Sequence, residues 1–162
     1  MELDELYQMY VNDLYRYLFS LSKDHFTAED LVHETFYRAY VYLEDSEINE
    51  VKPWLFKVAY HSFVDYTRKN KRVILADHKI EEMDGYTPDK AFIEKEGFEH
   101  LLRLIHSIPE REKHAILLCD LHQLSYQASA EILNMNLNTL KSHVFRGRKR
   151  LQALIQREDY RW

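Results

Sequence analysis

Basic side chains gather in two stretches of this sequence, residues 51–72 and 137–162, and aromatic side chains accompany them in the first. The chain carries a formal net charge of -5, yet each of these stretches carries +5, whereas residues 1–50 carry −9 and residues 73–136 carry −6. Cationic groups bind phosphates, and aromatic rings stack on unpaired bases. This distribution predicts two separate contacts with one polyanion. The alternative is two solvated helix faces.

The C-terminal basic stretch belongs to a segment with helix-turn-helix spacing. Ser125 is suited to cap a short helix ending at Leu133, because its hydroxyl can accept a hydrogen bond from a backbone N–H of the first turn. Asn134 enters the left-handed region more cheaply than other non-glycine residues, so it suits the tight turn before a long helix. In proteins that bind DNA, such a second helix lies in the major groove.

The long helix has an apolar and a polar side when residues are placed about 100° apart. The apolar side holds Leu140, Val144, Gly147, Leu151 and Leu154. The polar side holds Asn138, Lys141, Ser142, Phe145 and Lys149, with Arg146 and Arg148 flanking. Short polar side chains near the helix start can reach base edges, and basic ones further along can reach phosphates. We therefore predict that the polar side contacts DNA, with Phe145 against either a partner or a thymine methyl.

The first basic stretch predicts a helix with Pro53 in its first turn and an end near Asn70. One broad face of it holds Lys57, Tyr60, His61, Val64, Arg68, Lys71 and Arg72, opposite Leu55, Ala59, Ser62, Phe63 and Tyr66. An opened duplex needs cationic groups for its backbone and rings or pockets for its extruded bases. This face offers both, although core packing is the expected role of Tyr66 and an equal possibility for Tyr60.

The elements that position these residues are predicted to be helices. With Gly 3 and Pro 3 in 162 residues, the chain has little turn chemistry for a sheet. From residue 2 to 21, apolar residues recur at intervals of three and four residues, which predicts one amphipathic helix. Thr27, followed by acidic residues, is the expected N-cap of a second helix that ends near Leu43. We expect these helices and the one with Pro53 in its first turn to form a bundle.

A second helical domain is expected after a flexible linker. The linker, residues 73–91, contains Gly85, Pro88 and many acids without a sustained apolar period. Residues 92–107 are amphipathic again, and a new helix begins around Ser107 and Pro109. The fold class is therefore all-α, with two small helical domains. Their predicted bounds are 1–72 and 92–162.

Other classes of protein find little support in the sequence. No apolar run approaches about 18 residues, and the N-terminus lacks the pattern of a signal peptide, so we expect a cytoplasmic protein without direct membrane insertion. One cysteine, Cys119, cannot form an internal disulfide. His106, His114 and His122 follow one another at intervals of eight residues, which is too far for one helix turn to bring them to a metal. The sequence also lacks a glycine-rich loop that could bind phosphate. We expect no metal, no cofactor and no enzymatic activity.

Four segments, in order along the chain, resemble the bacterial sigma factors of the extracytoplasmic-function type, group IV of the sigma-70 family. They are Ala28 to Tyr40 (AEDLVHETFYRAY, similar to region 2.2), Val51 to Arg72 (regions 2.3 and 2.4), Ile108 to Glu112 (IPERE) and Leu124 to Leu151 (region 4.2). The resemblance implies a sigma factor that binds core RNA polymerase and directs promoter recognition and DNA opening. It also implies that residues 1–72 are sigma region 2 and residues 92–162 are sigma region 4.

The resemblance implies roles for individual residues. Contacts with the −35 element are implied for Asn138, Thr139, Lys141, Ser142, Arg146 and Lys149, and contacts with the −10 element for Lys57, Tyr60, His61, Arg68, Lys71 and Arg72. Docking on the β′ clamp helices of polymerase is implied for Asp30, Glu34 and Arg38, whose spacing equally fits an ordinary acid–base pair on a solvated face. Region 4 would also contact the β flap, and a membrane-anchored anti-sigma factor is an implied partner.

The sequence departs from the family pattern at His33, His61, His143 and Phe145, so it does not predict the promoter sequence. A rival function is an autonomous helix-turn-helix regulator whose residues 1–90 sense a signal or dimerise. That rival explains the C-terminal helix but leaves the basic, aromatic residues 51–72 unexplained.

Overall fold

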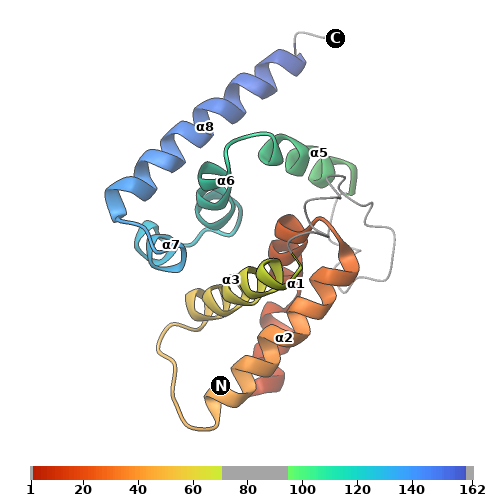
Figure 1. Ribbon diagram of the computed structural model, residues 1–162, viewed down its shortest axis with the longest axis vertical. Helices are drawn as coiled ribbons and strands as arrows, with labels where there is room; N and C mark the ends of the chain where they lie inside the picture. Colours follow the sequence, from red (N-terminus) through yellow and green to blue (C-terminus); the bar gives the residue numbers. More distant parts are fainter. Residues whose placement is uncertain (1, 71–94, 160–162) are drawn as a thin grey trace. The chain divides into compact units, whose positions relative to one another are not determined.

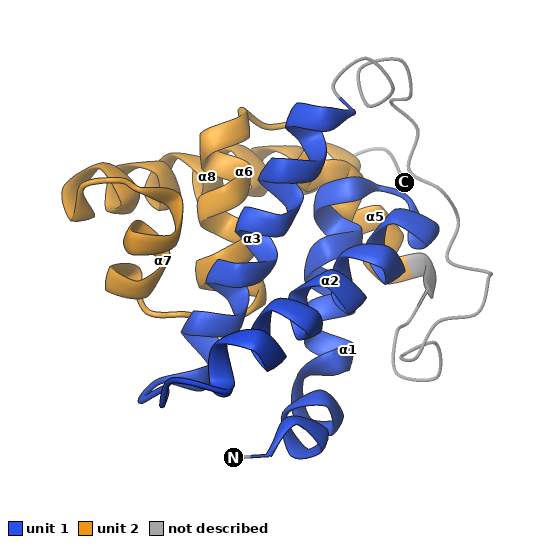
Figure 2. Cartoon of the chain, turned by 60° about the horizontal axis from the view of Figure 1, so that its bottom comes forward, with its two compact units in different colours: residues 1–95 blue, residues 96–162 orange. Residues whose placement is uncertain are grey.

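The computed structural model describes residues 2–70 and 95–159, and within these ranges the regular elements are helices (Figure 1). This confirms the all-α prediction. The chain divides into two compact units, Met1–Lys95 and Glu96–Trp162 (Figure 2). The predicted linker 73–91 lies outside the described residues, as do Lys71 and Arg72.

The first unit is a bundle of three helices, α1 (Leu3–Ser22), α2 (His25–Leu43) and α3 (Val51–Lys69), each of which contacts the other two. Its centre is aromatic: Tyr17 and Phe56 are fully buried, with ring centroids 5.0 Å apart. The expected helix from residue 2 to 21 is therefore present. Lys23 ends it in the left-handed region, and its N–H donates to the Phe19 carbonyl.

Helix α2 begins earlier than the sequence predicts. Its N-cap is Asp24, not Thr27, because the Asp24 carboxylate accepts the Phe26 backbone N–H at 3.3 Å. The Thr27 hydroxyl lies inside the first turn and donates to Asp24 Oδ2 at 2.6 Å. The negative charge of an acidic N-cap interacts favourably with the positive end of the helix dipole. The Asp24 carboxylate can also accept a hydrogen bond from a backbone N–H that has no partner within the helix.

The second unit consists of α5 (Lys95–His106), α6 (Glu110–Ile116), the π-helix η2 (Leu117–Leu121), α7 (Tyr126–Leu133) and α8 (Leu137–Asp159). The predicted helix-turn-helix is present as α7 and α8. The Ser125 hydroxyl accepts the Ala128 N–H at 3.0 Å, and Asn134 adopts φ 53 in the turn, as expected.

The π-helix was not predicted. Its extra residue per turn directs the His122 N–H to the Leu117 carbonyl, and Gln123 follows with φ 57. The irregular turn ends the α6 direction and places Asp120 on the surface before α7 begins.

Helix α8 packs on α6 and α7 through its apolar side. Gly147 permits the close approach to α6, because a Cβ at that position would lie 2.8 Å from Ile116 Cγ1. Leu140 and Val144 are 0% and 2% exposed on the same side. Among the described helices, none has the length and apolar character needed to span a membrane.

Candidate nucleic-acid and polymerase interfaces

The outward side of α8 presents a row of side chains that we call the reading strip: Asn138, Lys141, Ser142, Phe145 and Lys149. All five are exposed, and so are the two further predicted DNA contacts, Thr139 and Arg146. On the opposite side Leu140, Val144 and Gly147 are buried, while Leu151 and Leu154 are half-buried. The two-sided pattern expected from the sequence is therefore present.

Two contacts order the strip. The Asn136 side-chain oxygen accepts the Asn138 backbone N–H at 2.8 Å, which satisfies a free N–H at the start of α8. Further along, Lys149 Nζ lies 4.9 Å from the centroid of the Phe145 ring, and that ring is 61% exposed. The ring and the ammonium thus form one exposed cation–π pair.

Arginines on both edges of the strip are held by carboxylates from the elements beneath. Arg148 donates through Nε and Nη2 to the two Asp120 oxygens at 2.9 and 2.6 Å, and these hydrogen bonds raise the pKa of its guanidinium. On the other edge Arg150 Nε donates to Glu112 Oε1 at 2.8 Å, and Arg146 Nε lies 4.0 Å from Glu112 Oε2. The structure thus brings two carboxylates, Asp120 and Glu112, into ion pairs with three arginines of the predicted DNA-binding helix.

His143 lies beside Arg146, with Nδ1 3.2 Å from the guanidinium Nη2. Partial burial and the neighbouring Arg146 charge lower the pKa of His143 below its ordinary value of 6.5. The neutral ring is therefore favoured at neutral pH, and its Nδ1 can accept from Arg146.

The predicted basic face of α3 is only partly exposed. Lys57, His61 and Arg68 are exposed, whereas Tyr60 is half-buried. On the other side Leu55, Ala59 and Ser62 are buried, and Phe63 and Tyr66 are half-buried. The Tyr66 hydroxyl lies 3.4 Å from Thr27 Oγ1 on α2, so Tyr66 packs between helices, as expected.

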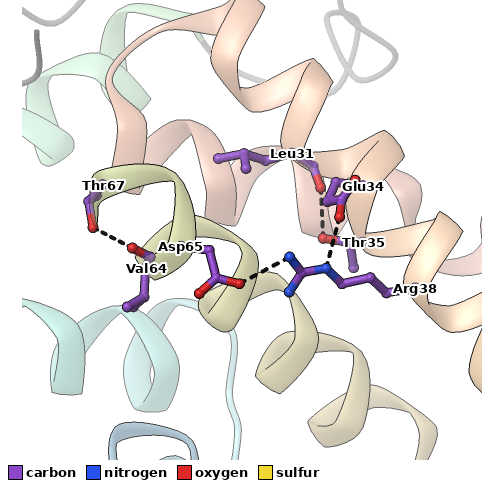
Figure 3. A network of polar contacts seen from close by, with 7 residues as sticks. All are labelled: Leu31, Glu34, Thr35, Arg38, Val64, Asp65 and Thr67. Carbon is purple, nitrogen blue, oxygen red and sulfur yellow. Dashed lines mark hydrogen bonds and ion pairs between the residues drawn. The ribbon is translucent and has the colours of Figure 1, made fainter. Parts of the chain in front are cut away.

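The three predicted polymerase-binding residues of α2 differ in their surroundings. Asp30 and Glu34 are exposed, whereas Arg38 is engaged twice (Figure 3). Its Nε donates to Glu34 Oε1 at 2.9 Å, and its Nη2 donates to Asp65 Oδ2 on α3 at 3.0 Å. Burial lowers the pKa of Arg38, but the bonds to the two carboxylates outweigh it and raise the pKa overall. The acid–base pair that the spacing suggests is thus formed, and Asp65 extends it to α3.

Histidines and the single cysteine form no metal site among the residues that the structure describes. Cys119 is buried, and burial raises the pKa of its thiol, which disfavours the reactive thiolate.

Comparison with known proteins shows what the two units are. Residues 6–73 match the family described as Sigma-70 region 2, and residues 98–151 match Sigma-70, region 4. The chain is 40% identical over 158 residues to the ECF RNA polymerase sigma factor SigM of Bacillus subtilis, covering 97% of each protein. The chain belongs to the extracytoplasmic-function sigma factors. As a member of this family it binds RNA polymerase and promoter DNA in transcription initiation.

A second sigma factor and two solved structures are also similar to this ECF sigma factor. It is 26% identical over 164 residues to SigW of Bacillus subtilis, with 94% of this chain and 88% of the relative covered. Two solved structures share the fold. The sigma factor RpoE in complex with the anti-sigma factor NepR from Bartonella quintana superimposes with a TM-score of 0.76 at 24% identity, over 94% of this chain and 96% of RpoE. CnrH in complex with the cytosolic domain of CnrY gives a TM-score of 0.69 at 17% identity, over 95% of this chain and 87% of CnrH.

The acidic partners of the arginines in this sigma factor are not predictable from the sequence. Glu112 belongs to the IPERE segment, and Asp120 belongs to none of the four segments that resemble the family. No spacing rule joins Asp120 to Arg148 or Glu112 to Arg150, because the partners are 28 and 38 residues apart. The same holds for Asp65, which is 27 residues from Arg38.

Proposed function

We propose that this ECF sigma factor recognises promoters through two surfaces, the reading strip of α8 for the −35 element and the basic face of α3 for the −10 element. The observation that carries the proposal is the exposure of all six predicted −35 contacts on a helix whose opposite side is buried. A helix seated in this way can enter the major groove without disturbing its own core.

The −10 surface is argued from charge and rings. Exposed Lys57 and Arg68 supply cations on α3, and His61 and Tyr60 supply rings on the same face, with centroids 6.1 Å apart. Cations hold the single-strand backbone and rings stack on bases, which is what an opened duplex requires. Lys71 and Arg72 extend this assignment by the family resemblance alone.

Polymerase docking is proposed for α2. Asp30 and Glu34 present exposed carboxylates that can pair with a basic partner, and Arg38 holds Glu34 in place. We assign this surface to the β′ clamp helices, and apolar surface of the second unit to the β flap. The proposed division is region 2 over residues 1–72, a linker over 73–91 and region 4 over 92–162.

DNA binding by the free chain is expected to be weak. Each basic surface offers a few phosphate contacts, and the remainder of the chain is acidic. Polymerase would hold the two surfaces at promoter spacing, so that they act as one bivalent ligand. We place this action in the cytoplasm, without catalysis by the sigma factor itself, under control of a membrane-anchored anti-sigma factor. Family membership supports the anti-sigma partner.

Transcription in vitro tests the proposal. The purified chain is added to core RNA polymerase with a library of promoter fragments, and the transcripts are sequenced. We expect transcripts that start downstream of a shared pair of −35 and −10 elements. Transcripts no different from those of core polymerase alone would refute the assignment.

A further inference from the structure

The arginines on the edges of the reading strip have a role that the proposed −35 contacts leave out. We infer that Arg148 and Arg150 bind DNA phosphates on the two sides of the groove, each aimed by a positioning carboxylate, Asp120 or Glu112. The inference rests on the proposed −35 role of α8. It adds two DNA-contacting residues and two positioning residues to that site.

Asp120 orients Arg148 but occupies only some of its N–H donors. Nε and Nη2 carry both hydrogen bonds to the carboxylate, and Nη2 also lies 3.5 Å from the Tyr126 hydroxyl. A guanidinium has more N–H donors than these contacts use, and those of Nη1 remain for a ligand. The side chain is 53% exposed, so a phosphate can reach them.

Arg150 repeats this arrangement on the other edge. Its Nε donates to Glu112, whose side chain is 7% exposed, while the Arg150 side chain is 56% exposed. The buried Glu112 carboxylate lies between α6 and α8, and it has Arg146 as a second neighbour at 4.0 Å. A buried carboxylate without a partner is costly, which favours retention of the Glu112–Arg150 contact.

The two arginines lie on opposite sides of the strip. At about 100° per residue, Arg148 lies roughly 80° to one side of Asn138 and Arg150 roughly 120° to the other. A helix in the major groove has one phosphate backbone along each of its flanks. Each backbone would therefore meet one guanidinium whose orientation is already fixed, which reduces the entropy lost on binding.

The alternative is that the ion pairs with Asp120 and Glu112 prevent the arginines from contacting DNA. The two accounts differ in the salt dependence of binding. A phosphate contact contributes about −0.9 to the slope of log affinity against log salt concentration, whereas a withheld arginine contributes nothing.

The test measures promoter binding by the reconstituted holoenzyme from about 50 to 200 mM salt, on a promoter fragment that the wild-type holoenzyme selects. Arg148→Gln and Arg150→Gln should each make the slope shallower by about 0.9. Arg103→Gln is the matched control, because Arg103 is an exposed arginine on α5 that also faces a carboxylate, Glu99 at 3.8 Å. A wild-type slope in both strip-edge variants would overturn the inference.

Asp120→Asn distinguishes a carboxylate that orients Arg148 towards DNA from one that keeps Arg148 away from DNA. If Asp120 aims Arg148, this variant should bind the selected promoter about three- to tenfold more weakly relative to an unrelated duplex, the cost of ordering one flexible side chain. Tighter promoter binding with a steeper slope would mean that Asp120 withholds Arg148. Arg148→Lys, which keeps the charge, should retain the wild-type slope, and thermal unfolding of each variant separates lost contacts from lost structure. Should the wild-type holoenzyme select no promoter, the proposed function fails instead.

Discussion

Arg38 of α2 and Asp65 of α3 are joined by an ion pair of 3.0 Å between Nη2 and Oδ2. The first helix carries the proposed polymerase-binding residues and the second carries the proposed −10 contacts. Arg38 also holds Glu34 at 2.9 Å, so a single guanidinium fixes a carboxylate on each helix. The proposed docking surface and the proposed −10 surface are therefore connected through one side chain, Arg38 (Figure 3).

Reversing the charge of Arg38 should weaken the capture of core polymerase. In Arg38→Glu the new carboxylate repels Glu34 and Asp65, which displaces the acidic docking surface. We expect less polymerase in a pull-down and a loss of stability of about 1 kcal/mol or less, because these ion pairs are partly exposed. Arg16→Glu, which breaks the Arg16–Asp13 pair on α1, is the control. Normal capture by Arg38→Glu would mean that the docking surface lies elsewhere.

Reversing two charges of the reading strip should abolish dependence on the −35 element. Lys141→Glu with Lys149→Glu removes two exposed cations and repels the DNA backbone. We expect transcription from −35-dependent promoters to fall on the order of a hundredfold, since two contacts worth ~1–3 kcal/mol each are lost. Polymerase capture should be unchanged. Reversing Arg103 and Arg157 instead gives the same change in net charge, and equal losses in both double variants would argue against the strip.

Adding one methyl group at Gly147 should destabilise the second unit. The new Cβ would lie 2.8 Å from Ile116 Cγ1 and 3.4 Å from Glu112 Cβ, so either the Ile116 side chain or α8 itself must shift. Overpacking of this kind costs about 1–3 kcal/mol, which outweighs the gain in helix propensity of ~1 kcal/mol. Thermal unfolding measures the loss. Gly97→Ala, in an exposed position of α5, should be neutral or stabilising, and a stable Gly147→Ala would contradict the close packing.

Acidification should cost stability through Glu110. Hydrogen bonds from His114 and Lys113 lower the pKa of its carboxyl from 4.5 to about 2. A lowered pKa in the folded state stabilises the protein above pH 4.5, and this contribution is lost as the pH falls towards 2. Its side chain is 70% exposed, so the effect is small.

Thermal unfolding of Glu110→Gln at pH 6 and pH 3 checks this sign, because the variant lacks the titrating group. It should lose less stability on acidification than the wild type. Glu131→Gln on α7 is the matched control. Identical acid sensitivity of Glu110→Gln and the wild type would show that the ion pairs of Glu110 contribute nothing.

Local signals in the sequence predicted most of the helices and their exposed sides. The Ser125 cap, the Asn134 turn and the two sides of α8 depend on residues within one or two turns of each other, so spacing alone reveals them. Where two local candidates compete, the prediction is less secure: Asp24 and Thr27 are both good N-caps, and only the hydrogen-bond geometry decides for Asp24.

Contacts between distant parts of the chain were not predictable in this way. The π-helix sets where Asp120 meets Arg148, and the approach of α8 to α6 at Gly147 sets where Glu112 meets Arg150. Both depend on how helices pack, which a periodic pattern does not specify. The docking role of Asp30, Glu34 and Arg38, the −10 contacts of α3 and the −35 contacts of α8 stay predictions, since they concern partners outside this chain.

Footprinting on a selected promoter tests the central claim most directly: two DNA-binding surfaces that act together only when polymerase holds them. The free chain and the holoenzyme are compared at equal concentration, with cleavage protection for the −35 element and permanganate reactivity for opened bases at −10. We predict protection and opening with the holoenzyme, and neither with the free chain. A −35 footprint by the free chain alone, unchanged when polymerase is added, would contradict the account and favour an autonomous regulator.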